Sequence, residues 1–229
     1  LEFRRVLFRS EKLDLQTKLA SLGIALFSYP FLFCVDRGNI ESFIFIFTGF
    51  FLLAFLKERY KTAAVFIAMA ASLKLYPCIL AWLFIKKKQY KACILSGVLT
   101  VVISVISLYF LHGGIVENFH GMVREMRHFT THYTLYEQTR NDGTLFDVGF
   151  NGLSLFGVSR HIGHFIPINI SASTGFMIFN IFAIVILPFV VYYVLKFENI
   201  LWKQVFMLFS FVILFMGTSF DYKMLTLLL

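Results

Sequence analysis

The chain has 229 residues, of which 59% are hydrophobic and only 15% are charged. A water-soluble domain of this size has too little polar surface to cover so many apolar side chains, which excludes an ordinary soluble fold. The net charge of +8 lies in short clusters between apolar runs and not along one polar face, which argues against a nucleic-acid partner. Composition therefore predicts an integral membrane protein.

The two ends of the sequence predict a piece of a longer protein. The opening LEFRRVLFRS resembles translated adapter sequence, so we predict that residues 1–10 are not native. Residues 224–229 stop inside an apolar run. We therefore predict a single transmembrane domain over residues 11–229.

Apolar runs long enough to enter a bilayer follow one another along the chain, and another begins near Tyr222. This pattern predicts an all-α, polytopic transmembrane helix bundle. One long amphiphilic stretch, at about residues 113–173, is predicted to lie on one membrane face. The apolar runs cover residues 19–35, 42–56, 62–85, 92–111, 174–195 and 204–218.

Lysine and arginine in the short connections predict the orientation. The connections at residues 57–61, 86–91 and 196–203 are basic, whereas the connection at 36–41 carries two acids and one base. Cytoplasmic loops are enriched in Lys and Arg. We therefore expect a multi-pass protein of a bacterial inner membrane, with the basic turns inside and the 36–41 and 113–173 segments outside.

The run at residues 62–85 conflicts with that orientation. As one helix it would be about 36 Å long and would place the two flanking basic turns on opposite membrane faces. Pro77 removes a backbone donor and biases Tyr76 away from helical geometry, and Lys74 in mid-membrane costs several kcal/mol unless it faces water or a partner. A broken, re-entrant hairpin is the favoured interpretation, and a single kinked span is the alternative.

Lys74 is the sharpest functional signal. An ammonium at a membrane-embedded helix break suits a phosphate or diphosphate headgroup, and the alternative is a lysine that only snorkels from a helix end. Around Gly38, Arg37 offers a guanidinium to phosphate, while Asn39 and Glu41 offer polar groups to sugar hydroxyls. An ordinary turn, with Asn39 capping the next helix, is the alternative there.

Two other groups of polar residues are weaker candidates. Asp221 is either an acid in the first turn of a helix or a site carboxylate. All six histidines lie between residues 112 and 164, but the HExxH arrangement is absent and we predict no metal site. Aromatic residues beside Arg124 and Arg127 predict that this segment lies along the membrane surface.

Together these elements resemble glycosyltransferase family 87, the polyprenol-phosphate-mannose-dependent mannosyltransferase-like proteins of the C-type membrane glycosyltransferases. The resemblance rests on R-G-N followed by an acid at residues 37–41 and on K-x-Y-P at residues 74–77. The mannosyltransferase that builds glycosylphosphatidylinositol anchors has similar elements. Residues 218–223 look like the family's late Ser–aromatic–acid element, although Phe220 replaces the usual Trp and Tyr222 stands where His is frequent.

The resemblance implies an inverting transfer of a hexose, with mannose expected, from a polyprenyl-phosphate carrier to an acceptor at the outer membrane face. It implies membrane lipid and the lipid-linked sugar as partners, and no cofactor. Arg37 and Lys74 would contact the phosphate. The catalytic base is expected in an outer loop upstream of Glu11, so the chain alone is expected to be inactive. Substrate binding is assigned to Arg37, Asn39, Glu41, Lys74, Tyr76 and Asp221.

The residues leave two other classes of protein open. A transporter or flippase for a lipid-linked or anionic substrate also uses a broken helix and a buried cation. Such a protein often has paired interrupted helices in two repeats, and the sequence shows one clear break. A scaffolding membrane protein would explain the composition but not Lys74.

Overall fold

The computed structural model describes residues 28, 29, 32, 36, 38–129, 155 and 172–215, and every regular element within these ranges is helical. The all-α prediction is therefore confirmed. The first predicted run, at residues 19–35, lies largely outside the described residues, as does the one near Tyr222. The elements are α4 (Glu41–Leu56), α5 (Tyr60–Leu73), the 3-10 helix η1 (Tyr76–Ala81), α6 (Trp82–Lys86), α7 (Tyr90–Phe110), α8 (Gly114–Phe129), α10 (Ala172–Lys196) and α11 (Leu201–Phe215).

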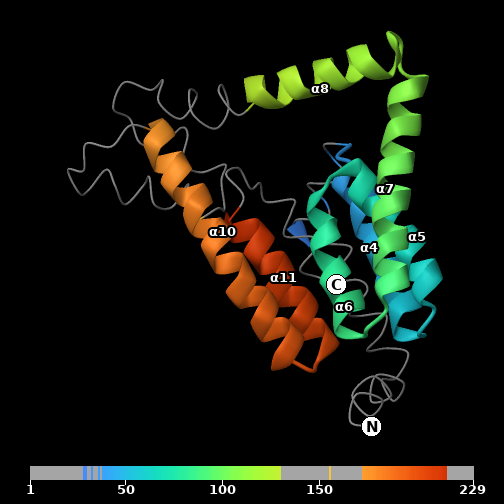
Figure 1. Ribbon diagram of the computed structural model, residues 1–229, viewed down its shortest axis with the longest axis vertical. Helices are drawn as coiled ribbons and strands as arrows, with labels where there is room; N and C mark the ends of the chain where they lie inside the picture. The colour runs from blue at the N-terminus through green and yellow to red at the C-terminus, as the bar shows by residue number, and fades with distance from the viewer. Residues whose placement is uncertain are drawn as a thin grey trace.

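Helices α4 and α5 form an antiparallel hairpin, and α7 also packs against α5 (Figure 1). The buried positions of α5 are mostly alanine, including Ala63, Ala64 and Ala68. Small side chains let neighbouring helix backbones approach closely, which is the usual way in which helices associate in a membrane. At the edge of the hairpin the rings of Phe50 and Phe66 stack at a centroid distance of 5.2 Å.

The run at residues 62–85 is broken into two arms. The first arm ends at Lys74, whose backbone is extended (φ −149°, ψ 138°), and the second arm is η1 followed by α6. Phe84 in the second arm contacts Phe51 and Phe55, with both centroid distances at 5.7 Å. Because Phe55 is near the end of α4, the second arm has returned to the level of the turn between α4 and α5. The re-entrant hairpin is therefore confirmed, and the single kinked span is wrong.

The break lies at Lys74, within the predicted segment 74–77, whereas Tyr76, which Pro77 was expected to bias away from helical geometry, is helical. Tyr76 is the first residue of η1, and Pro77 occupies the second position. The first backbone N–H groups of a helix have no partner within it, so proline costs no hydrogen bond there. Pro77 thus starts the second arm, while the extended backbone of Lys74 ends the first.

The second arm is tied to the α10–α11 pair at its far end. Lys86 Nζ donates hydrogen bonds to the backbone oxygens of Val194, at 2.7 Å, and Glu198. Gln204 Nε2 donates to the same Glu198 oxygen at 2.6 Å, and the Glu198 carboxylate accepts from the backbone N–H of Ile200 at 2.8 Å. The Val194 bond satisfies a carbonyl in the last turn of α10, which has no partner inside the helix, and the bonds to Glu198 lie in the turn between α10 and α11.

The core joins the two parts of the bundle. Buried apolar side chains of α4, α5, η1 and α6 meet those of α10 and α11 in one cluster that includes Phe51, Ile67, Phe84, Val194 and Phe209. Its members come from helices far apart in the sequence, and burial of their apolar surface favours the assembled bundle. The site described below lies at the edge of this cluster.

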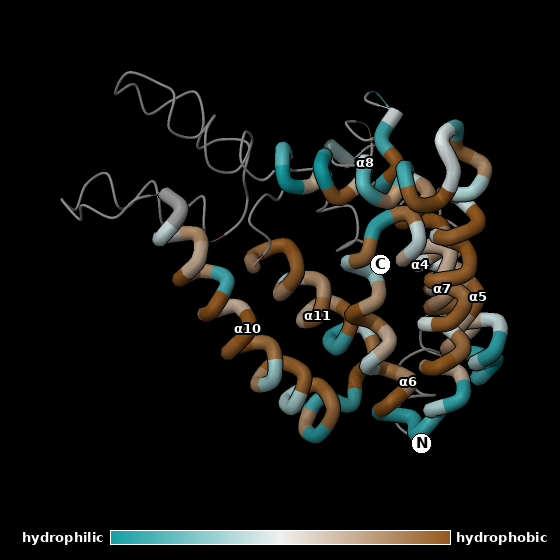
Figure 2. The backbone as a smooth tube through the Cα atoms, turned by 45° about the horizontal axis from the view of Figure 1, so that its top comes forward, coloured by the Kyte–Doolittle hydropathy of each residue, from teal (hydrophilic) through white to brown (hydrophobic). Residues whose placement is uncertain are grey.

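The outer faces of α7 and α10 are apolar and exposed. Tyr90–Phe110 and Phe176–Lys196 are long and apolar enough to cross a membrane, while α4, α5 and α11 are shorter apolar helices. Figure 2 shows hydrophobic positions along these helices and hydrophilic ones at the turns between them. Exposed residues such as Val101 and Ile184 are the side chains that lipid would cover.

Candidate functional site

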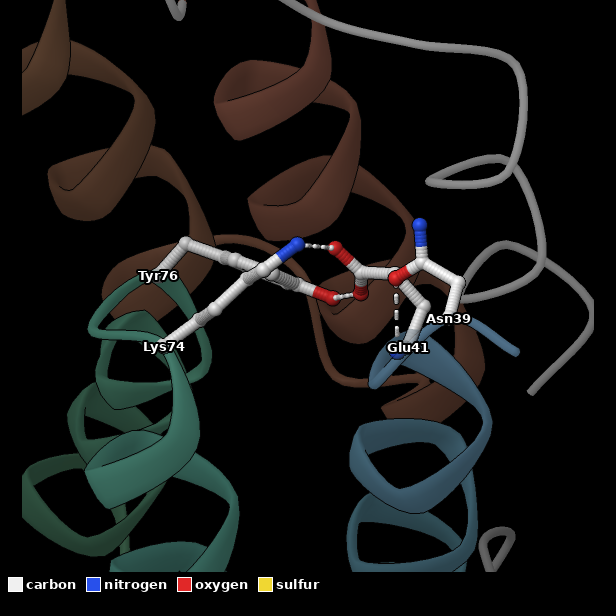
Figure 3. Close-up of polar contacts among 4 residues, drawn as sticks. All are labelled: Asn39, Glu41, Lys74 and Tyr76. Carbon is white, nitrogen blue, oxygen red and sulfur yellow. Dashed lines mark hydrogen bonds and ion pairs between the residues drawn. The ribbon is translucent and has the colours of Figure 1, made fainter. Parts of the chain in front are cut away.

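Glu41, Lys74 and Tyr76 form one hydrogen-bonded cluster at the break in the re-entrant hairpin. Lys74 Nζ donates to Glu41 Oε1 at 2.7 Å, and Tyr76 Oη donates to Glu41 Oε2 at 2.5 Å. Figure 3 shows the Lys74 and Tyr76 side chains converging on the carboxylate from the break between the two arms of the hairpin and Glu41 approaching from α4. Both oxygens of the carboxylate are therefore engaged.

The turn before α4 aims Glu41 into the bundle. Gly38 has a φ of +56°, a conformation that glycine adopts readily, and the chain then turns into the helix. Asn39 Oδ1 accepts a hydrogen bond from the backbone N–H of Glu41 at 3.1 Å. Ile40 occupies the N-cap position, which has no side-chain cap bond, so Asn39 does not cap α4; its bond instead closes the turn that leads into Glu41, the first residue of α4.

The cluster is electrostatically asymmetric. The Glu41 side chain is 0% exposed, whereas the Lys74 side chain is 33% exposed. A buried carboxylate needs a paired cation and hydrogen-bond donors, and Lys74 and Tyr76 supply them. An anion that approaches the cluster from outside therefore meets the ammonium and not the carboxylate.

Helix α11 supplies a wall of the site. The Tyr76 ring makes an edge contact with the buried ring of Phe209, at a centroid distance of 6.1 Å. Such edge-to-face pairs add stability beyond their buried area. The phenol is therefore held between Glu41 at its hydroxyl and Phe209 at its ring. Sequence reasoning missed Phe209, because nothing in a phenylalanine-rich helix distinguishes one ring from the others.

The cluster lies within the thickness that α7 spans. Helix α5 has 14 residues, so Lys74 lies about 21 Å from the turn at which α5 begins. Helix α7 starts at the same end of the bundle and has 21 residues, or about 31 Å. Since a bilayer's hydrocarbon core is about 30 Å thick, the cluster lies inside the membrane-facing part of the bundle.

The structure brings together four of the six predicted binding residues: Asn39, Glu41, Lys74 and Tyr76. Arg37 and Asp221 lie outside the described residues. The ion pair between Glu41 and Lys74 was not predicted. The pair could have been predicted, because both residues lie at the same end of two adjacent helices that are expected to run antiparallel.

Metal-binding groups do not gather in the part of the chain that the structure describes. No group of three or more His, Cys, Asp or Glu side chains is close enough there to hold a metal ion. Three of the six histidines, His132, His161 and His164, lie outside the described residues. The cluster at Lys74 has one carboxylate, and its nearest partners are an ammonium and a phenol, which suit an anionic ligand rather than a cation.

A comparison with protein families identifies one match, which covers most of the chain. The matching family model is that of glycosyltransferase family 87, over residues 3–217. No curated protein and no solved structure matches the chain. The matched region contains the R-G-N and K-x-Y-P elements and therefore the whole cluster around Glu41.

Proposed function

The chain belongs to glycosyltransferase family 87 and is therefore a membrane glycosyltransferase; we propose that it transfers a hexose, specifically mannose, from a polyprenyl-phosphate carrier to an acceptor at the outer membrane face. One observation carries this proposal. The partly exposed ammonium of Lys74 is held at a membrane-embedded helix break by the fully buried carboxylate of Glu41. A lipid phosphate reaches that depth with its chain in the bilayer, which a soluble nucleotide sugar does not.

Lys74 has a direct role in the proposed reaction. The acceptor oxygen attacks C1 of the hexose, and the bond between C1 and the phosphate oxygen breaks with its electron pair moving to the phosphate. Negative charge therefore increases on the lipid phosphate as the reaction proceeds. A preorganised cation at that oxygen stabilises the transition state more than the ground state. We propose Lys74 for this contact and Arg37 as a second phosphate ligand.

Glu41 is the positioning residue of this site and not the base. Its carboxylate is fully buried and already accepts hydrogen bonds from Lys74 and Tyr76. An acceptor hydroxyl would need an accessible carboxylate within hydrogen-bond reach. We propose that Glu41 offsets the cost of placing an ammonium in an apolar bundle and that the acceptor's proton goes to an ionised carboxylate outside this cluster, which acts as the base. Asp221 remains our candidate for a sugar contact.

Transfer by the full-length protein in membranes tests the proposal. With radiolabelled polyprenyl-phosphate mannose as donor, Lys74→Ala is expected to lower transfer at least 100-fold, which is the usual cost of losing one preorganised electrostatic contact. Lys91→Ala, which removes an exposed lysine from the start of α7, is the matched control and should retain wild-type transfer. Polyprenyl-phosphate glucose, supplied in parallel, tests the choice of sugar.

Two results would overturn the proposal. Unchanged transfer in Lys74→Ala would remove Lys74 from the mechanism. Movement of the lipid-linked sugar across vesicle membranes without formation of a glycosidic bond would favour a transporter. The described helices give that alternative no added support, because α10 continues through its internal Pro188 where a second interrupted helix would break.

A further inference from the structure

Helix α8 carries an exposed apolar stripe. Ile115, Phe119 and Met122 recur at intervals of four and three residues, so they share one face, and all three are exposed. Among the described elements α8 packs chiefly against the end of α7. The stripe therefore needs an occupant.

The corner between α7 and α8 fixes the direction of α8. Gly113 and Gly114 have φ values of +107° and +81°, which let the chain leave the axis of α7. Asn118 Nδ2 donates to the backbone oxygens of Leu108, at 3.0 Å, and Leu111, at 3.1 Å. Figure 1 shows α8 running across the end of α7 instead of continuing it. The Asn118 bonds satisfy terminal carbonyls of α7 and hold this geometry.

The corner lies at the height where the hydrocarbon of a bilayer ends. Helix α7 begins beside the basic turn at residues 86–91 and is about 31 Å long, close to the thickness of a hydrocarbon core. Its exposed apolar residues continue to Phe110 and Leu111. A helix that starts three residues later and runs across the end of α7 therefore lies at the level of the lipid headgroups.

The apolar stripe is on the side of α8 that faces back along α7. The side chain of Asn118 points to the end of α7, because it bonds carbonyls there. At 100° per residue, Ile115 and Met122 project within about 60° of Asn118, whereas Arg124 projects about 120° away. Arg124 and Arg127 therefore face away from the end of α7, the apolar stripe lies toward it, and Glu125, at about 20° from Asn118, lies at the edge of the stripe. We propose that α8 is an interfacial helix whose apolar stripe inserts into the lipid.

Charge decides how α8 binds lipid. Its two acids, Glu117 and Glu125, balance its two arginines, Arg124 and Arg127. Attraction to anionic lipids needs an excess of positive charge, which α8 lacks when its histidines are neutral. Insertion therefore depends on the apolar stripe and is insensitive to anionic lipid. Insertion of the stripe sets how deeply the end of the bundle that contains Lys74 lies in the membrane.

Spin-label accessibility in vesicles tests this inference independently of any transferase activity. In a variant whose cysteines Cys34, Cys78 and Cys93 are replaced by serine, nitroxides are attached at Met122→Cys and, as the matched control, at Arg124→Cys. In phosphatidylcholine vesicles we expect the label at 122 to be more accessible to oxygen than to a water-soluble nickel chelate, and the label at 124 to show the reverse. Adding phosphatidylglycerol should leave both ratios unchanged.

A second pair of positions, Phe119→Cys and His120→Cys, repeats the comparison one turn earlier. Greater accessibility to the nickel chelate at 119 and 122 would show that the stripe faces water. Exclusion of both reagents there would show that protein covers it, either another part of the chain or a second copy. Either result would overturn the proposal, as would insertion that appears only with phosphatidylglycerol.

Discussion

Glu41 and Lys74 are 33 residues apart in the sequence and meet because α4 and α5 pack as an antiparallel hairpin. Of the two, only Lys74 keeps part of its side chain exposed. Removing one partner of such a pair leaves a buried charge without compensation, which costs more than removing both. The pair therefore makes the stability of the bundle depend on the same lysine that we assign to the phosphate.

This dependence predicts that stability and activity respond differently to paired substitutions. Lys74→Met leaves the Glu41 carboxylate buried without its cation and is expected to lower the free energy of unfolding by about 3 kcal/mol. The double variant Glu41→Gln/Lys74→Met removes both charges and should recover most of that loss. Thermal unfolding in detergent should therefore rank the midpoints as wild type, then double variant, then Lys74→Met.

Transfer assays complete that comparison. Both variants lack the ammonium, so both are expected to be inactive although only one is strongly destabilised. Equal midpoints for the single and double variants would show that Glu41 and Lys74 are not energetically coupled. An active double variant would show that the ammonium serves stability alone.

At the scale of helices, the α4–α5 turn and the α6–α7 turn share one geometry. Glu58 and Lys88 both have a φ of +57°. After each, a backbone N–H reaches back five positions: Arg59 donates to Ala54 oxygen at 2.9 Å and Gln89 donates to Phe84 oxygen at 2.8 Å. This is the Schellman ending, which usually has glycine at the left-handed position. Both turns therefore carry backbone strain that glycine would relieve.

Lys88→Gly is accordingly expected to stabilise the protein by about 1 kcal/mol, because a side chain in the left-handed region costs about that much. Lys87→Gly is the matched control. Lys87 has an ordinary φ of −83°, so glycine there adds only unfolded-state entropy and should destabilise by about 0.5–1 kcal/mol. Thermal midpoints of the two variants should move in opposite directions, and a fall in both would contradict the assigned strain.

At the scale of the whole molecule, the re-entrant hairpin places the basic turns at one end. The second arm brings residues 86–91 back beside residues 57–61, and Lys86 bonds to the end of α10 next to the α10–α11 turn. His112 lies at the other end of α7. The positive-inside tendency then assigns the basic end to the cytoplasm.

Cysteine labelling in intact cells tests that orientation. In the cysteine-free background, Lys61→Cys and Lys88→Cys should resist a membrane-impermeant maleimide until the cells are permeabilised, whereas His112→Cys should react at once. Protection of His112→Cys with ready labelling of the other two would invert the predicted topology. Labelling of only one of positions 61 and 88 would contradict the shared end.

Residue types and their spacing were sufficient to predict the helical membrane bundle, the positions of most helices, the interruption near Lys74 and the family. These features follow from local properties: apolar runs of membrane length, proline's missing donor and the cost of an unpaired charge in hydrocarbon. The resemblance led us to expect Asn39, Glu41, Lys74 and Tyr76 in one site, but it did not predict the hydrogen bonds among them.

Only the tertiary structure decided that run 62–85 returns as two arms, that Lys74 pairs with Glu41 and that Phe209 packs against Tyr76. The same run of apolar residues is compatible with one crossing of the bilayer and with a hairpin that folds back, because both arrangements keep its side chains out of water. The choice is made by packing: Phe84 against Phe51 and Phe55, and a buried carboxylate that only a returning chain can supply with both an ammonium and a phenol.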